Sequence, residues 1–184
     1  MARLYLVRHG KAAAGFGESM DPGLDETGLK QADAAAARLS PLGPLPILTS
    51  PLRRTRETAA PLAELWRKTP VVEEAVAEIP SPKGMTLEGR IAWLRKLMAG
   101  SWRDVAYDLA RWRESLIATL AAIEADTVIF SHYVAINVAA GAALGDDRVV
   151  VFSPDNCSVT VFDVTGNGLQ FIEKGHEAEL TKVN

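Results

Sequence analysis

The chain has 184 residues, a size that fits one domain with a buried core. Hydrophobic residues (48%) and charged residues (23%) occur at the levels of soluble globular proteins, which argues against disorder. The formal net charge is −3 and no block of Lys or Arg appears, which argues against a dedicated nucleic-acid-binding protein. A small phosphorylated ligand needs only a local cluster of cations, which this composition can supply.

The cysteine content and the length of the apolar runs indicate in which cellular compartment the protein is expected. Cys157 is the only cysteine, so an intramolecular disulfide is excluded, and we expect it to be a small buried residue. The N-terminal residues reach Arg8-His9-Gly10 before the apolar core of a signal peptide develops. No stretch approaches the ~18 consecutive apolar residues of a membrane span. We therefore expect a cytoplasmic protein with no membrane contact.

The first half of the chain alternates strands and helices. Residues 4–7 predict a short buried strand, and after a Gly-rich loop Asp25 or Thr27 can cap a helix that runs to about Leu39. A second short strand is expected over 47–49. The apolar side of the first helix is predicted to consist of Leu29, Ala32, Ala36 and Leu39.

The second helix is expected to begin at Ser50-Pro51, which has the form of an N-cap followed by proline at the first helical position. Pro61 is expected to kink or shorten this helix. Residues 71–76 predict another strand or extended segment. The apolar residues at helical spacing in the second helix are Leu52, Ala59, Leu62 and Leu65.

The second half begins with a helical region from Thr86, interrupted at Gly100-Ser101. A third buried strand is expected over 127–130 and a helix rich in small residues over 133–144. The two apolar stripes before that strand are Leu87, Ile91, Leu94 and Met98, then Val105, Leu109, Trp112, Leu116, Leu120 and Ile123.

The C-terminal part, with segments 158–164 and 169–174 around a Gly-Asn-Gly turn, predicts a β-hairpin. No repeat or linker is visible. The expected fold is α/β with three layers: a mostly parallel central sheet, helices on both faces and an antiparallel C-terminal hairpin. We expect one domain over residues 1–184, with a helical lid-like segment around 83–115.

Basic side chains follow three of the predicted strands. Arg8 and His9 come at the end of the first, Arg54 lies shortly after the second, and His132 follows the third. Ligands of open α/β sheets bind in the crevice beyond the carboxyl ends of the strands. Two histidines and two guanidiniums gathered there favour an anion, and the arginine fork matches the oxygens of phosphate.

Other polar residues have simpler interpretations. His176 is expected to be solvated, and Arg56 to be exposed. Arg53 precedes Glu57 by four residues, a spacing typical of a surface ion pair on a helix. Glu73 and Glu74 are adjacent and predict a solvated edge.

Four ordered blocks carry a resemblance to a known family, the histidine phosphatase superfamily, also called phosphoglycerate mutase-like. They comprise Leu4 to Gly10 with the Arg-His-Gly signature, Leu24 to Ala32, Thr49 to Ala59, and Phe130-Ser131-His132. Asn156 to Thr160 also resembles the last central strand of the family. The resemblance covers nearly the whole chain, and its weakest part is Thr86 to Asp126.

The resemblance implies a phosphatase in which His9 attacks phosphorus to form a phosphohistidine that water then hydrolyses. Arg8 and Arg54 would bind the phosphate, and His132 would be the second catalytic histidine. The family's proton donor follows the third strand, where Glu78 is the best positional match and Glu73 or Glu74 the alternative. No metal and no cofactor is expected.

Two departures from the family pattern concern the pocket. Lys11 to Phe16 replaces a common continuation with a Trp-Asn pair, which removes one expected phosphate contact that Lys11 would have to replace. Tyr133 stands where glycine is common. Specificity is expected to come from the Phe16 loop and from Lys83 to Trp102. Four aromatic residues could form an apolar wall there or belong to the core: Trp93, Trp102, Tyr107 and Trp112.

Three functions are compatible with this pattern. The first is hydrolysis of a small phosphorylated substrate or a phosphoprotein. The second is a phosphoglycerate-type mutase, which would pass the phosphoryl group to another hydroxyl and usually has a longer chain. The third is a binding module without catalysis, which the retention of His9, His132, Arg8, Arg54 and Glu78 disfavours. The oligomeric state is left open.

Overall fold

The structure is a computed structural model that describes residues 1–14 and 18–179. The strands of this part form one mixed sheet in the order β3-β2-β4-β1-β5-β6. The strands β1, β2, β3 and β4 pair in parallel, and β5 and β6 join antiparallel as a hairpin. The strands are β1 (Ala2–Arg8), β2 (Ile47–Thr49), β3 (Val71–Val72), β4 (Thr127–Ser131), β5 (Val159–Thr165) and β6 (Gly168–Glu173).

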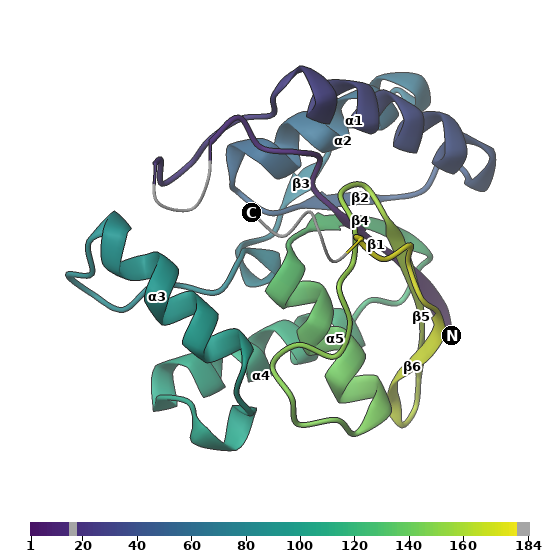
Figure 1. Ribbon diagram of the computed structural model, residues 1–184. Helices are drawn as coiled ribbons and strands as arrows, with labels where there is room; N and C mark the ends of the chain where they lie inside the picture. Colours follow the sequence, from purple (N-terminus) through teal and green to yellow (C-terminus); the bar gives the residue numbers. More distant parts are fainter. Residues whose placement is uncertain (15–17, 180–184) are drawn as a thin grey trace.

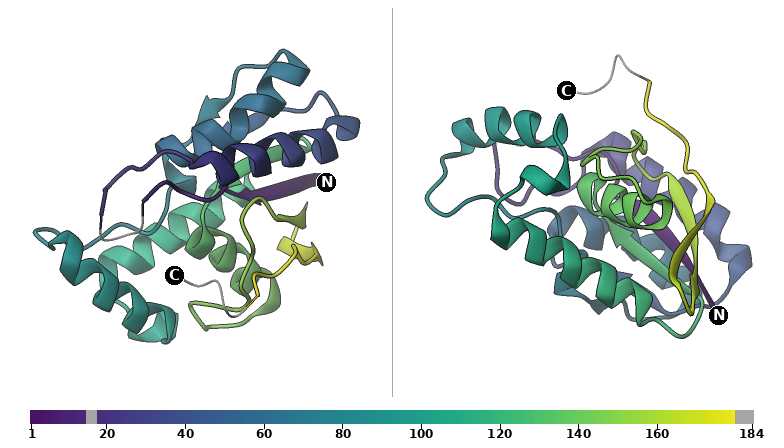
Figure 2. Two further views of the ribbon diagram at one scale, coloured as in Figure 1. Left: turned by 45° about the horizontal axis from the view of Figure 1, so that its top comes forward. Right: turned by 90° about the horizontal axis from the view of Figure 1, so that it is seen from below.

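Helices cover both faces of the sheet (Figure 1). They are α1 (Glu26–Leu39), α2 (Arg53–Trp66), α3 (Leu87–Met98), α4 (Tyr107–Ala121) and α5 (Tyr133–Leu144). The first two enclose one apolar core against the sheet, and α4 and α5 enclose a larger one against the other face. Figures 1 and 2 show α3 at the edge of the molecule, away from the strands. The expected three-layer α/β fold with its antiparallel hairpin is confirmed.

Small side chains explain how closely the helices approach the sheet. One side of α1 is built from Ala32, Ala35 and Ala36, all buried. The helix α5 buries a similar run, including Ala135, Ala139 and Ala140. Alanine loses no side-chain entropy on burial, and its short side chain lets a backbone lie close to its neighbour. Every residue of β4 is buried, as expected for a central strand covered on both faces.

The second helix begins later than the sequence pattern predicted. The expectation that Ser50 caps it is wrong: Leu52 is the N-cap and α2 starts at Arg53. The Ser50 hydroxyl instead accepts a hydrogen bond from the Leu52 amide at 3.1 Å and lies 2.7 Å from Nε2 of His132, so it is committed to the turn before α2 and to His132. Pro61 lies inside α2 without shortening it, because the helix continues to Trp66.

Three apolar residues that were expected on the buried sides of helices are exposed: Leu29, Leu65 and Ile91. On α1 the predicted Ala32, Ala36 and Leu39 are buried, and Gly28 and Ala35 complete the buried side in place of Leu29. The strand expected over 71–76 is reduced to two residues of β3. It ends because Glu73 turns the chain, its carboxylate accepting a hydrogen bond from the Ala75 amide at 3.0 Å.

The strand register brings the polar strand ends together. Arg8 of β1 lies beside Ser131 of β4, and Thr49 of β2 lies beside Phe130. The pairing continues one residue further, since the His9 amide donates to the Ser131 carbonyl at 3.1 Å. The Ser50 amide likewise donates to Phe130 at 3.1 Å. The strands therefore deliver three residues to the same edge of the sheet: His9, Ser50 and His132.

In the described part of the chain, no helix is both long and apolar enough to cross a bilayer. The single domain over 1–184 and the lid role of residues 83–115 stay predictions. The Phe16 loop, named above as a source of specificity, lies outside the described residues.

Candidate active site

His9 follows the last residue of β1 and is only 5% exposed. Its Nδ1 lies 2.7 Å from the Gly10 carbonyl oxygen. A carbonyl can only accept, so Nδ1 carries the proton and Nε2 keeps its lone pair. Burial lowers the pKa of His9 well below its usual value, and the charges of Arg8 and Arg54 lower it further. His9 is therefore a neutral imidazole with a free nucleophilic nitrogen.

The backbone around His9 is held on several sides. The Gly10 amide donates to the Thr58 hydroxyl of α2 at 3.0 Å, and the Asn156 side-chain amide donates to the His9 carbonyl at 2.9 Å. A β-carbon at Gly10 would lie 2.7 Å from the Gly28 carbonyl of α1. Glycine at this position therefore lets the loop after β1 lie directly on the start of α1, which fixes the direction of His9.

His132 is fully buried between β4 and α5. Its ring lies 5.3 Å from the His9 ring, centroid to centroid, at an interplanar angle of 59°. Nε2 lies 2.7 Å from the Ser50 hydroxyl. Burial and then the neighbouring His9 and Arg54 lower the pKa of His132 well below its usual value. Both imidazoles are thus neutral at neutral pH.

Two guanidiniums flank the histidines. Arg54 lies in the first turn of α2 and is 4% exposed. Arg8 is half-buried; its Nη1 donates to the Pro154 carbonyl at 2.8 Å and its guanidinium lies 5.1 Å from the centre of the Tyr133 ring. Burial lowers the pKa of both arginines from a very high ordinary value, so both remain charged.

Glu78 brings a buried carboxyl to the same place. It is 7% exposed, and its Oε1 accepts from the Ile79 amide at 3.0 Å while Oε2 makes a long contact of 3.5 Å with the Val134 amide. Burial raises the pKa of Glu78, against the opposing effects of these amides and of Arg54 and Arg8. A carboxyl with a raised pKa can hold a proton where an exposed one would not.

The segment that carries Glu78 is tied to β4, because the Ser131 hydroxyl donates to the Val76 carbonyl at 2.7 Å. The two alternative acids are placed differently. Glu73 uses its carboxylate to stop β3, and Glu74 is exposed. Both therefore lack the burial that distinguishes Glu78.

Arg90 was not singled out from the sequence. It lies on α3, is 9% exposed, and its Nη1 is 4.0 Å from the Met20 sulfur in the segment after β1. Its charge contributes to lowering the pKa values of Arg54 and His132, so it lies near both. A third guanidinium therefore borders the site. Nothing in the amphipathic pattern of α3 marks it, since helical arginines are usually exposed.

Three residues with simpler predicted roles, Arg53, His176 and Cys157, behave as expected. Arg53 pairs with Glu57 at 2.6 Å and His176 is exposed. Cys157 is buried, which raises its pKa to about 12 and keeps it a thiol. Lys11 pairs with Asp25 at 3.1 Å, with its side chain 59% exposed. The Lys11 ammonium is thus paired with a carboxylate at the start of α1.

The aromatic residues near α3 belong mainly to the core. Trp102 is buried and its ring lies 6.2 Å from that of Trp112, while Trp93 packs partly buried against the same cluster. Tyr107 is 76% exposed. The ring of Tyr133 lies against the Arg8 guanidinium, and its hydroxyl is 2.9 Å from the Ser153 hydroxyl.

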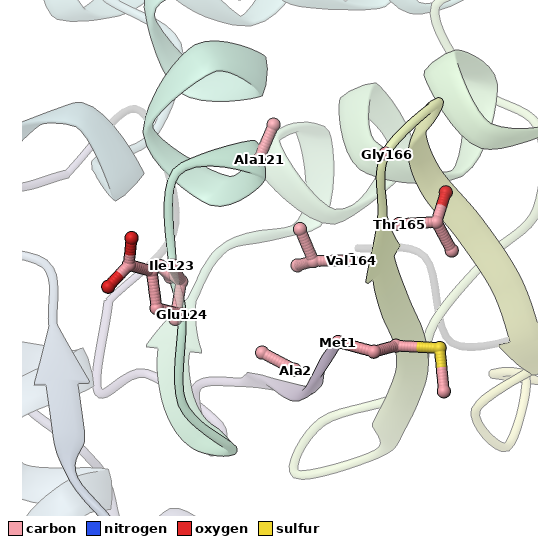
Figure 3. Close-up of a pocket in the computed structure, with 8 residues that line it drawn as sticks. All are labelled: Met1, Ala2, Ala121, Ile123, Glu124, Val164, Thr165 and Gly166. Atoms are coloured by element: carbon pink, nitrogen blue, oxygen red, sulfur yellow. The ribbon is translucent and has the colours of Figure 1, made fainter.

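A separate hollow lies at the opposite end of β1, where Met1 and Ala2 meet the ends of α4 and β5 (Figure 3). Its lining is mostly aliphatic, with Glu124 as the charged member. It brings together no set of catalytic groups. Among residues 1–14 and 18–179, no group of three or more His, Cys, Asp or Glu side chains is placed to bind a metal ion.

Residues 4–175 match the sequence pattern of the histidine phosphatase superfamily, branch 1. The chain belongs to the histidine phosphatase superfamily. A stretch of 74 residues is 39% identical to a probable phosphatase of Schizosaccharomyces pombe, and covers 38% of this chain and 35% of that protein. The chain therefore matches much less than two thirds of this curated relative.

Solved structures share the fold over nearly the whole chain. A mycobacterial glucosyl-3-phosphoglycerate phosphatase is 24% identical in sequence and superposes with a TM-score of 0.74. The match covers 97% of this chain and 99% of the mycobacterial chain. Phosphoserine phosphatase of Entamoeba histolytica is 22% identical with a TM-score of 0.75, covering 96% and 98%. At these identities the likeness concerns the fold, and it agrees with the family membership.

Proposed function

We propose that the protein is a metal-independent phosphomonoesterase that acts through a phosphohistidine on His9. The observation that carries this proposal is the neutral, buried His9 with its Nε2 lone pair free beside two charged guanidiniums. A neutral imidazole is the form that can attack phosphorus. Family membership supports the same reaction. Arg8 and Arg54 would stabilise the charge on the equatorial oxygens as it develops.

In the first step, Nε2 of His9 forms a bond to phosphorus while the bond from phosphorus to the ester oxygen breaks. The leaving oxygen takes the proton of the Glu78 carboxyl and departs as an alcohol. Burial of Glu78 supports this role, because its raised pKa keeps a proton available. His132 would donate a hydrogen bond to a phosphoryl oxygen.

In the second step, a water takes the position of the departed alcohol. The Glu78 carboxylate accepts a proton from it as its oxygen bonds to phosphorus. The bond between phosphorus and Nε2 breaks, which returns His9 to its neutral form and releases inorganic phosphate. Glu78 is protonated again, so the cycle closes with no other proton donor.

The substrate class we propose is a small phosphorylated metabolite. Relatives of the same fold are phosphatases of glucosyl-3-phosphoglycerate and phosphoserine, which are small phosphorylated compounds. A phosphoprotein is the alternative substrate, and transfer to a second hydroxyl, as in a mutase, is the alternative reaction. The cytoplasmic location stays a prediction.

The test is hydrolysis of p-nitrophenyl phosphate with EDTA present and with vanadate added. We expect turnover that persists in EDTA and is inhibited by vanadate. Activity lost on chelation and restored by a divalent metal would contradict the metal-independent mechanism. A parallel screen of phosphorylated metabolites, phosphopeptides and phosphoglycerates with a bisphosphate primer, scored by kcat/KM, separates the three alternatives.

A further inference from the structure

The hydroxyl of Ser50 lies at the centre of a buried polar cluster between the start of α2 and His132. It is 2.7 Å from Nε2 of His132, 3.1 Å from the Leu52 amide nitrogen and 3.1 Å from the Thr55 hydroxyl oxygen. Ser50, Thr55 and His132 are all fully buried. Each proton in this cluster must therefore be assigned to a partner inside the protein.

The contacts settle most of the assignment. The Leu52 amide can only donate, so it uses one lone pair of the Ser50 oxygen. The shortest contact of the Thr55 hydroxyl is 2.8 Å to the Leu52 carbonyl, which can only accept. The hydrogen of Ser50 can then go to Nε2 of His132 at 2.7 Å or to the Thr55 oxygen at 3.1 Å, and Nε2 is the closer acceptor. A ring nitrogen that accepts this hydrogen cannot carry a proton itself.

The second ring nitrogen of His132, Nδ1, then carries the proton. Nδ1 of His132 is buried and has no hydrogen-bond partner among the described residues. The ring lies beside that of His9, with the charged arginines around it. A protonated Nδ1 in these surroundings can donate a hydrogen bond to an anionic oxygen. An unprotonated Nδ1 would instead direct its lone pair at that oxygen, which is unfavourable.

We propose that Ser50 is a positioning residue: it donates to Nε2 of His132 and so holds the neutral ring with its proton on Nδ1, ready to donate to a phosphoryl oxygen. The neutral ring supplies a hydrogen bond without adding a further cation to a site that already holds Arg8 and Arg54. The tautomer stands on the contacts of Ser50 alone. Its use toward phosphate rests on the proposed function.

The tautomer can be read by NMR on protein labelled with ¹⁵N-histidine. The chain has three histidines, so His9→Gln and His176→Gln variants assign the His132 signals. Spectra are taken without ligand and with inorganic phosphate. We expect a protonated Nδ1 and an unprotonated Nε2 in both. Protonation at Nε2 would show that Ser50 accepts from His132 and donates to Thr55, and the proposal would be wrong.

Ser50→Ala should release the tautomer to a mixture and lower kcat by roughly 10–100-fold, by analogy with the loss that follows removal of the partner that orients a metal-binding histidine. Ser50→Thr, which keeps the hydroxyl, should restore the Nδ1 proton and part of the rate. Thr127→Val is the matched control: it removes another buried hydroxyl, bonded to the Ala125 carbonyl at 2.7 Å at the far end of β4. We expect it to leave tautomer and kcat unchanged.

An unchanged His132 tautomer in Ser50→Ala would overturn the proposal, even if kcat fell through loss of stability. Phosphomonoesterase activity and tautomer are measured separately. A wild-type protein with the expected tautomer and no turnover would contradict the proposed function while leaving the role of Ser50 intact.

Discussion

Replacing Glu78 by Gln tests the proposed proton donor through the leaving group. The change keeps the size of the side chain and an oxygen that can accept from the Ile79 amide, 3.0 Å from the carboxyl in the wild type. It removes the only proton that Glu78 could donate. Because Glu78 is 7% exposed, bulk water is poorly placed to supply that proton in its stead.

The expected magnitude depends on the ester. An alkyl alcohol leaves poorly as an alkoxide, so losing general acid catalysis should slow its phosphate ester by roughly 10²–10⁴-fold. That range corresponds to about 3–5 kcal/mol of transition-state free energy. p-Nitrophenolate is a good leaving group and needs little protonation. The variant should therefore lose far more rate on an alkyl phosphate than on p-nitrophenyl phosphate.

The assay compares kcat/KM for the two esters across pH in wild type, Glu78→Gln and Glu74→Gln. The last is the control, since Glu74 is exposed and undergoes the same change. Glu78→Gln should also lose the high-pH limb of the kcat profile, which the raised pKa of Glu78 would set above the usual carboxyl range. Equal slowing of both esters would mean that Glu78 is structural, and Glu73 would be the next candidate.

Three further predictions concern the cations and histidines of the site. Arg54→Ala should cost roughly 2–4 kcal/mol of transition-state stabilisation, and a kcat/KM within threefold of wild type would contradict its contact with phosphate. Arg90 borders the site and is separate from the two arginines proposed to bind the transferred phosphate, so Arg90→Gln should raise KM for phosphate esters that carry a second negative group and leave KM for p-nitrophenyl phosphate unchanged; an equal effect on both would contradict this prediction. Below a pH of about 6.5, His9 and His132 bind protons in the unfolded chain but stay neutral in the folded protein. The free energy of unfolding should therefore decrease as the pH is lowered through this range, by up to about 1.4 kcal/mol per pH unit for each histidine. Urea unfolding over pH should show a smaller slope in His9→Gln, and an identical slope would refute the lowered pKa.

The sheet and most helix positions could be predicted because local patterns determine them. The apolar runs 4–7 of β1 and 128–130 of β4 and the small-residue helix α5 have strong signals, and the predicted bounds 133–144 are those observed for α5. The gathering of His9, Arg54 and His132 followed from the geometry of parallel strands. The register of β1 and β4 places Arg8 beside Ser131, and so brings His9 and His132, the next residues in the chain, close together.

What the sequence could not give depends on tertiary contacts. Ser50 has the form of a helix cap, but its hydroxyl is used by His132, which is 82 positions away. Arg90 is brought to the site by the packing of α3, in the segment least similar to the family pattern. The exposure of Leu29 reflects which side of α1 meets α2, and helical periodicity alone fixes that face only to within a residue.

The measurement that tests the central claim most directly is chemical trapping of the intermediate. Wild-type protein is mixed with a ³²P-labelled phosphate ester and quenched during turnover, and the labelled peptide is identified. We predict phosphate on His9 as an adduct that is labile in acid and stable in base, and its absence in a folded His9→Ala variant without turnover. Near wild-type kcat in that variant, or a label on another residue, would contradict nucleophilic catalysis by His9.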